Sequence, residues 1–484
     1  MKNDRYYLKC ITAGRAGEGL RADWQEQLRI VQNEIGFEYI RFHGVFHDDM
    51  AIYDEDENGN PKLWFGYFDK LFDFLLSIGL KPILELGFMP DKLKCNDGTV
   101  FWWKGHSCPP SDYNKWALLV SETIKHSIER YGIDEVKHWY FEVWNEPNLG
   151  SFWHGTQDEY FKLYTYSVNA IKAVDKDLRV GGPSTSGADF REDLDYLKEF
   201  ISFCENNNLP VDFFTAHPYP TCWALDGDGV EHMGYISREI CSEFLDNIKS
   251  IVDNSPYKNA EIHLTEWNSS PSPRDLIHDT PFIAPFILYN VTQNFGKVDS
   301  LGFWTFTDIF EENGPGDTEF HGGFGLISHN GIKKPSYYAY QFLAQLGDEI
   351  LSISHNKIIS KCNDDYVVIL WNYCYYKDDF AQGDRTALNI TSRDDVFLNK
   401  VEQINIELNL NGNYSVEEYL LNKDASALHN WVKIGAPQYP VHDEIDYLKK
   451  SSTPIAVNYK ISNNFVKNFI LNPHEVVMIK IAKE

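Results

Sequence analysis

Strand-like segments alternate with helix-like segments along the first 346 residues of this chain. The strand-like segments are short apolar runs, whereas the segments between them carry apolar residues at helical spacing, as do Trp24, Leu28 and Val31. Strands are expected at 6–13, 38–44, 81–88, 139–144, 178–182, 211–217, 262–268 and 300–307. Helices are expected at 23–35, 65–78, 112–131, 157–174, 191–206, 237–252, 282–295 and 336–346. Eight such units predict an α/β fold, a (β/α)8 TIM barrel whose strand carboxyl ends all meet on one face.

The alternation stops near Asp348. The segments 366–372, 402–410, 455–461 and 475–481 are short, rich in strand-forming residues and separated by Asn, Gly, Asp and Pro, with little helix between them. This pattern predicts a C-terminal β-sandwich domain. We therefore expect a catalytic barrel over 1–346 and a β-sandwich accessory domain over 347–484, with the first few residues as candidates to join the sandwich.

Two glutamates end predicted barrel strands. Glu146 follows the fourth strand in Trp144-Asn145-Glu146-Pro147, and Glu266 ends the seventh strand before Trp267-Asn268. Most of the 71 Asp and Glu residues must be solvated surface groups. These two differ because each follows an apolar strand and is flanked by Trp and Asn, which can stack on a sugar and hydrogen-bond to it. They predict a pair of carboxylates at the barrel mouth.

Further polar or aromatic side chains are expected at the same mouth. They are His43 after strand two, Asn145 beside Glu146, His217 and Tyr219 after strand six, Trp304 at strand eight, and Glu311 with Glu312 just beyond it. For any single histidine or tryptophan the alternative is an ordinary core position. Arg41, Glu85 and Glu142 also lie within strand patterns, and we interpret them as structural ion pairs inside the barrel.

The charge of the chain limits which classes of molecule it can bind. The chain has 44 basic and 71 acidic residues, a formal charge of −27, which repels nucleic acid and anionic membranes. A small neutral oligosaccharide suits this charge better, and the aromatic content of 15% is high, as in many carbohydrate-binding proteins.

The termini and the cysteines predict the compartment. The N-terminal residues lead into no apolar stretch of signal-peptide length, and no stretch approaches the roughly 18–20 apolar residues of a membrane span. A cytoplasmic location is therefore expected. The eight cysteines are scattered without a C-x-x-C pair, so neither a zinc site nor a disulfide framework is predicted.

Several motifs resemble a known family. Trp144–Pro147 and Leu264–Trp267 resemble retaining glycosidases with an acid/base glutamate after strand four and a nucleophile after strand seven. The segments 41–49, 141–149, 217–219, 304–312 and 321–326 are similar to bacterial β-xylosidases of glycoside hydrolase family 39. The similarity extends into the β-rich tail. Phe42, Ala216 and Trp267 depart from the residues expected there.

The resemblance implies roles for the site residues. Glu266 would be the nucleophile and Glu146 the acid/base, with no metal or organic cofactor. Asn145 would bind the sugar 2-hydroxyl and Trp304 would stack on the sugar. His43, His217 and Tyr219 would bind hydroxyls or orient the nucleophile, and one of Glu311 and Glu312 would hold outer hydroxyls. Tetrameric family members further suggest a homo-oligomer.

The function expected is a retaining exo-β-xylosidase that releases terminal xylose from short xylo-oligosaccharides. The open alternatives are a β-glucosidase, arabinosidase or iduronidase-like enzyme of the same fold, and a non-catalytic carbohydrate-binding protein. An iduronidase needs cationic groups for its uronate, and the acidic pair Glu311-Glu312 argues against it. Phe101, Trp102 and Phe310 are candidates for a pocket wall that excludes larger sugars.

Overall fold

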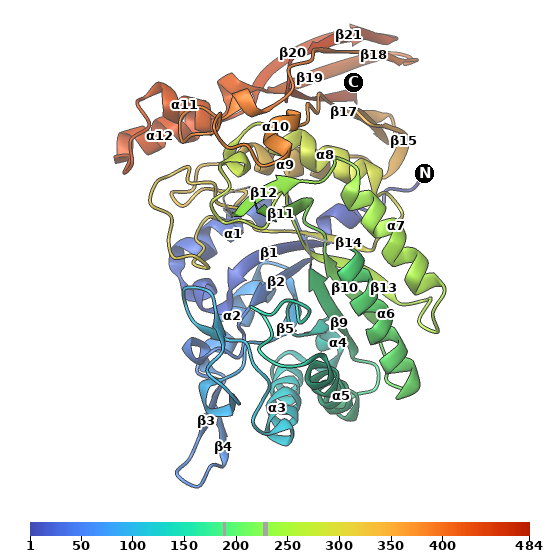
Figure 1. The fold of residues 1–484 in the computed structure, drawn as a ribbon. Coiled ribbons are helices and arrows are strands. Elements are labelled where there is room, and N and C mark those ends of the chain that lie inside the picture. Colours follow the sequence, from blue (N-terminus) through green and yellow to red (C-terminus); the bar gives the residue numbers. More distant parts are fainter. Residues whose placement is uncertain (187–189, 226–230) are drawn as a thin grey trace.

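The computed structural model describes residues 1–186, 190–225 and 231–484, and it contains a closed barrel of eight parallel strands (Figure 1). The strands are β1 Cys10–Arg15, β2 Tyr39–His43, β5 Lys81–Leu86, β8 Tyr140–Val143, β9 Arg179–Ser186, β10 Phe213–His217, β13 Glu261–Trp267 and β14 Ser300–Phe303. Their order around the barrel is β1-β14-β13-β10-β9-β8-β5-β2. The predicted TIM barrel is confirmed.

Helices surround this barrel and bury their apolar faces against it. They are α1 Ala22–Glu34, α2 Gly66–Ser77, α3 Tyr113–Tyr131, α5 Gln157–Val174, α6 Phe190–Asn206, α7 Ile240–Asp253, α8 Ile283–Gln293 and α9 Pro335–Ala344, with the short α4 Ile133–Val136 after α3. The start of α5 shows local sequence control, because Thr156 and Glu159 form a reciprocal capping box. The first strand begins later than predicted, since Tyr6–Leu8 forms a 3-10 turn.

Three small hairpins lie on loops that follow barrel strands, where the sequence predicted no strands. They are β3 Tyr53–Glu55 with β4 Pro61–Leu63, β6 Thr99–Val100 with β7 Gly105–His106, and β11 Thr221–Leu225 with β12 Glu231–Tyr235. They follow β2, β5 and β10, so they stand on the carboxyl-terminal side of the barrel. These loops therefore extend from the face of the barrel on which the glutamates lie.

The C-terminal region forms the predicted sandwich. A six-stranded antiparallel sheet has the order β15-β16-β17-β22-β19-β20, and a two-stranded sheet pairs β18 with β21. The strands are β15 Glu349–Ser354, β16 Lys357–Cys362, β17 Asp365–Trp371, β18 Glu402–Leu408, β19 Asn413–Leu421, β20 Ile455–Ser462, β21 Phe465–Leu471 and β22 Val476–Lys483. Val368, Ile404 and Phe469 from the two sheets share one apolar core. The N-terminus reaches this region, because Lys2 bridges to Glu349 on β15.

The tail also holds more helix than predicted. The helices are α10 Asp378–Ala381, α11 Ala427–Lys433 and α12 His442–Ser451. Leu428, Trp431 and Leu448 of α11 and α12 form a separate apolar cluster with Phe320 and Ile332 from the barrel loops. The expectation of little helix was wrong because these short helices are stabilised by packing on the barrel rather than by their own length.

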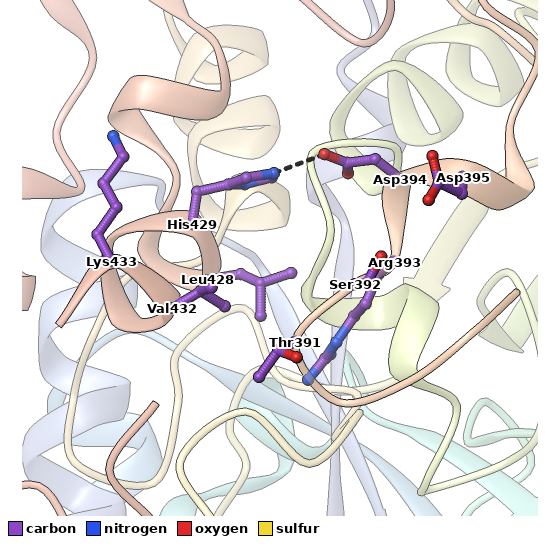
Figure 2. A pocket seen from close by; sticks show the side chains of 9 residues that line it. All are labelled: Thr391, Ser392, Arg393, Asp394, Asp395, Leu428, His429, Val432 and Lys433. Carbon is purple, nitrogen blue, oxygen red and sulfur yellow. Dashed lines mark hydrogen bonds and ion pairs between the residues drawn. The ribbon is translucent and has the colours of Figure 1, made fainter. Parts of the chain in front are cut away.

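A surface hollow of about 330 Å³ lies where the loop 391–395 meets α11 (Figure 2). His429 Nε2 lies 2.8 Å from Asp394 on the facing segment. This hollow belongs to the tail and shares no lining residue with the pair of strand-terminal glutamates. In the described parts of the chain, no helix combines the length and apolar character needed to cross a membrane.

Candidate active site

The fourth and seventh strands hold the two glutamates at the barrel mouth. After β8 the chain turns sharply, with Trp144 and Glu146 at φ of 72° and 46°. Such left-handed conformations cost about 1–3 kcal/mol each for residues other than glycine, and functional sites often contain them. The Glu146 N–H donates to the Ser184 carbonyl on β9 at 3.0 Å, which holds the turn in place.

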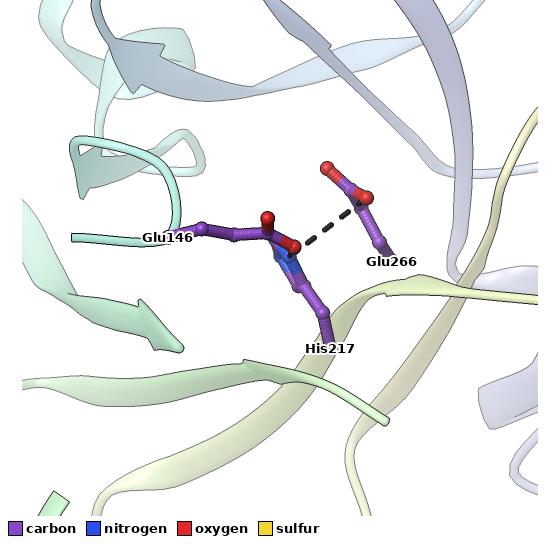
Figure 3. A group of neighbouring side chains, drawn as sticks. All are labelled: Glu146, His217 and Glu266. Atoms are coloured by element: carbon purple, nitrogen blue, oxygen red, sulfur yellow. Dashed lines mark hydrogen bonds and ion pairs between the residues drawn. The ribbon is translucent and has the colours of Figure 1, made fainter. Parts of the chain in front are cut away.

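The two carboxylates lie close together. Oxygens of Glu146 and Glu266 and a ring nitrogen of His217 all lie within 4.8 Å of one another (Figure 3). Both glutamates are nearly buried, at 5% and 4% exposure. Retaining glycosidases place their two carboxyl groups about 5–5.5 Å apart, so the spacing suits a reaction in which one of them attacks the sugar directly.

Glu266 is surrounded by donors. Arg41 Nη1 lies 2.5 Å from its Oε1, and the Tyr219 hydroxyl donates to its Oε2 at 2.8 Å. His43 Nε2 lies 3.5 Å from the same Oε1. A positive charge and a hydroxyl donor both stabilise a carboxylate, as a nucleophile requires.

Glu146 has a different environment. Burial is the largest cause that raises its pKa, from 4.5 to about 7. Its Oε1 lies 2.7 Å from Nδ1 of His217. A carboxyl group with a pKa near 7 can hold a proton at neutral pH and release it during reaction, which is the property of a general acid.

Arg41 does more than the structural pairing expected of it. It pairs with Glu85 Oε2 and Glu142 Oε2, each at 2.8 Å, as the sequence suggested. It also contacts Glu266, and its Nη2 donates to Asn145 Oδ1 at 2.8 Å. Its interpretation as purely structural was therefore wrong. The signal was present in the sequence, since Arg41 lies two residues before His43 and strand side chains alternate between faces.

The guanidinium also orients Asn145. Because the amide oxygen of Asn145 accepts from Arg41, its NH₂ group is the part that can meet a ligand, and it can only donate. A sugar hydroxyl would meet it as an acceptor.

The remaining predicted residues line the same mouth. His43 Nδ1 lies 2.6 Å from Glu85 Oε2, and its ring centroid lies 4.9 Å from that of Trp304 and 5.5 Å from that of Phe101. Trp304 is 2% exposed and packs edge-on against Phe310. Of the three wall candidates, Phe101 and Phe310 therefore lie beside site residues, whereas Trp102 is 58% exposed.

The structure separates Glu311 from Glu312. Glu311 Oε2 lies 2.6 Å from Arg15 Nη2, so its carboxylate is bound by a salt bridge. Glu312 Oε1 lies 3.7 Å from His43 Nε2. Burial, followed by the charges of Glu266 and Glu146, raises the pKa of Glu312 well above 4.5. Only Glu312 of this pair faces the glutamates.

Comparisons with known proteins agree with this geometry. The family model for glycosyl hydrolases family 39 matches residues 2–464. A β-xylosidase of Caldicellulosiruptor saccharolyticus is 37% identical over 99% of this chain and 96% of its own length. A β-xylosidase of Geobacillus stearothermophilus is 34% identical over 98% of this chain and 92% of its own.

Solved structures agree as well. A family 39 enzyme from Xanthomonas axonopodis pv. citri superposes with a TM-score of 0.91 at 31% identity, covering 100% of this chain and 95% of that one. A β-xylosidase from Caulobacter crescentus CB15, described as monomeric, superposes with a TM-score of 0.89 at 30% identity. The match covers 100% of this chain and 97% of that one. The resemblance seen in the sequence is confirmed: the chain is a glycoside hydrolase and belongs to family 39.

Proposed function

We propose that this protein is a retaining exo-β-xylosidase that removes terminal xylose from short xylo-oligosaccharides. The observation that carries the proposal is the pair of carboxylates within 4.8 Å in unlike environments, Glu266 among donors and Glu146 buried with a raised pKa. The two β-xylosidases that align with nearly the whole chain support xylose as the sugar.

In the first step, Glu266 Oε attacks the anomeric carbon while the bond from that carbon to the leaving oxygen breaks. The proton of Glu146 moves to the leaving oxygen, so the aglycone departs as a neutral alcohol. Arg41 and Tyr219 hold the attacking carboxylate in place. The product of this step is a glycosyl ester on Glu266.

In the second step, the ionised Glu146 takes a proton from water, and the oxygen of that water attacks the anomeric carbon. The ester bond to Glu266 breaks and its carboxylate is regenerated. Two inversions at one carbon release xylose with the configuration of the substrate. At the end of the cycle Glu146 again carries a proton.

Binding roles are proposed from the same geometry. Asn145 would donate to the sugar 2-hydroxyl through the NH₂ group that Arg41 leaves facing the site. Glu312 would accept from an outer hydroxyl, and Trp304 would contact the apolar face of the sugar. Glu311 is not assigned a substrate contact, because Arg15 and Arg21 bind its carboxylate.

The charge of the site disfavours a uronate substrate. Arg41 is already shared among three carboxylates, those of Glu85, Glu142 and Glu266. The carboxylate of Glu266 would lie beside a uronate and repel it. A neutral sugar avoids this repulsion.

A panel of aryl glycosides tests the proposed function. The β-xyloside should be hydrolysed fastest, and ¹H NMR should show β-xylose as the first product. First release of the α-anomer would contradict retention, and absence of hydrolysis across the panel would favour a binding protein. The tetramer expected from the family resemblance stays a prediction, which light scattering would test.

A further inference from the structure

A chain of hydrogen bonds links Glu142, on β8, to Glu146 through two hydroxyl groups and one imidazole. The hydroxyls of Thr265 and Ser184 donate to Glu142 Oε1 at 2.7 and 2.9 Å. His217 Nε2 lies 3.0 Å from Thr265 Oγ1 and 3.3 Å from Ser184 Oγ. His217 Nδ1 lies 2.7 Å from Glu146 Oε1. All five side chains are buried, so their hydrogen-bond directions are linked.

The first link is fixed by the charge of Glu142. Burial is the largest single cause and favours the neutral form of Glu142. The Arg41 guanidinium, 2.8 Å from Oε2, together with His217 and the Thr265 hydroxyl, outweighs burial and lowers the pKa of Glu142 below 4.5. An ionised carboxylate can only accept hydrogen bonds. The hydroxyl hydrogens of Thr265 and Ser184 must therefore point to Glu142.

The second link follows from the number of hydrogens. A hydroxyl has one hydrogen, so the oxygens of Thr265 and Ser184 can only accept from His217, and Nε2 must carry a hydrogen. Burial lowers the pKa of His217 to about 4, so at neutral pH its ring has one N–H. Nδ1 is then a bare acceptor. The hydrogen in the 2.7 Å contact must come from Glu146.

We propose that Thr265 and Ser184 are positioning residues that fix the tautomer of His217 and thereby keep Glu146 protonated until the glycosidic bond breaks. This rests on the proposed acid/base role of Glu146. An ionised Glu146 would face the Nδ1 lone pair, which is unfavourable, so the carboxyl group retains its proton. The same lone pair makes the ionised Glu146 a better base toward water in the second step.

Other charged groups also act on Glu146. Arg41 and His43 lower its pKa, Glu85 raises it, and Ser186 is hydrogen-bonded to its carboxyl group. Glu266 lies within 4.8 Å, and the ionisable groups of Glu312 and Tyr219 interact with it electrostatically. Replacing Thr265 or Ser184 removes no side-chain hydrogen bond that the structure describes for any of these groups. Glu142 loses two hydroxyl donors but keeps its ion pair with Arg41. A change in the pH profile of such variants would therefore report on the tautomer.

The test is the pH dependence of kcat/KM for the double variant Thr265→Val/Ser184→Ala. The substrate is the phenyl glycoside of the sugar that the wild type cleaves fastest, since phenol needs a proton to leave. Loss of both acceptors allows the Nδ1–H tautomer, which donates to an ionised Glu146. The basic limb should move to lower pH by about one unit, within the range that a single hydrogen bond shifts a carboxyl group. The acid limb should not move.

Two comparisons separate this effect from general damage. With the dinitrophenyl glycoside, whose leaving group needs no proton, the basic limb of the double variant should match that of the wild type. Thr265→Ser keeps the hydroxyl and should restore the wild-type profile on the phenyl glycoside. Thr215→Val is a matched control, because it removes a buried hydroxyl that has no partner among the described residues, two positions before His217.

An unmoved basic limb in the double variant, or an equal shift in Thr215→Val, would overturn the proposal. If thermal unfolding shows that the double variant does not fold, each single variant should show a smaller shift in the same direction, and no shift in either would be equally decisive. If Glu146→Ala keeps the wild-type basic limb on the phenyl glycoside, the acid role itself is wrong.

Discussion

Glu311 and Glu312 are neighbours in sequence but bind to different parts of the protein. Glu311 lies 2.6 Å from Arg15, whereas Glu312 lies 3.7 Å from His43, beside the two site glutamates. We therefore propose that Glu312 is the member of the pair that contacts the substrate, and the pair offers a matched experiment.

Glu312→Gln should lower kcat/KM for the aryl β-xyloside by roughly 10- to 200-fold, equivalent to about 1–3 kcal/mol, because a sugar hydroxyl loses the carboxyl group that accepts its hydrogen bond. Glu311→Gln, one residue away, should remain within about threefold of the wild type, since only a partly exposed ion pair is weakened. Steady-state kinetics of both variants checks this. A larger loss for Glu311→Gln would reverse the assignment.

Glu266→Ala should abolish turnover of every glycoside, because no covalent intermediate can form. Azide should then partly restore cleavage of a dinitrophenyl β-xyloside and give the α-azide, which NMR identifies. Glu261→Ala, at the other end of β13, is the control and should retain activity. Formation of the β-azide would exclude Glu266 as the nucleophile.

Glu146→Ala should still form the glycosyl-enzyme rapidly from dinitrophenyl xyloside, but its rate of xylobiose hydrolysis should fall by several orders of magnitude. The reason is that only the sugar leaving group needs a proton. In the proposed mechanism the protonated form of Glu146 is the active one, and burial raises its pKa to about 7. Activity on xylobiose should therefore fall as pH rises through about 7. Equal losses on both substrates, or a flat profile there, would contradict the acid role.

The β-xyloside should be preferred over the β-glucoside by about tenfold or more in kcat/KM, the effect of roughly 1–3 kcal/mol of pocket discrimination. Xylose lacks the hydroxymethyl group of glucose, and Phe101 and Phe310 pack beside the site residues His43 and Trp304. Polymeric xylan should be a poor substrate. Preference for the glucoside would exclude the xylosidase assignment but leave the two-glutamate mechanism intact.

We propose that residues 347–484 are an accessory domain that supports the barrel and carries no activity of its own. Arg393 of the tail donates to the carbonyls of Leu276 and Phe320 and pairs with Asp279 at 2.8 Å. Asp279 and Asp308 both pair with the buried Lys334 at 2.6 Å. Asp308 lies on the loop after β14 that also carries Glu312, so this buried cluster connects the tail to the site.

Arg393→Ala should lower the free energy of unfolding by about 3 kcal/mol. This value is at the low end of the range for breaking a buried ion pair, because Asp279 still pairs with Lys334. Lys433→Ala, which removes an exposed pair with Asp424, should cost less than about 1 kcal/mol. Urea unfolding of both variants measures the difference. A fragment ending at residue 346 should be insoluble or inactive, and a fully active one would refute the supporting role.

The sequence by itself determined the barrel, the sandwich and the position of the two glutamates. Apolar periodicity is a local property, and parallel strands joined by right-handed crossovers must bring their carboxyl ends to one face. Glu146 and Glu266 could therefore be placed together although they lie far apart in the chain. The same rule placed His43, Asn145, His217 and Tyr219 at that face.

Only the tertiary structure decided what these side chains contact. Glu311 turns away from the site because Arg15, at the end of β1, binds it, and Arg41 reaches Glu266 across the barrel. The state of His217 depends on hydroxyls from β9 and β13. Such directions are set by partners on other strands and loops, whose positions depend on the folded backbone, and no local pattern in the sequence encodes them.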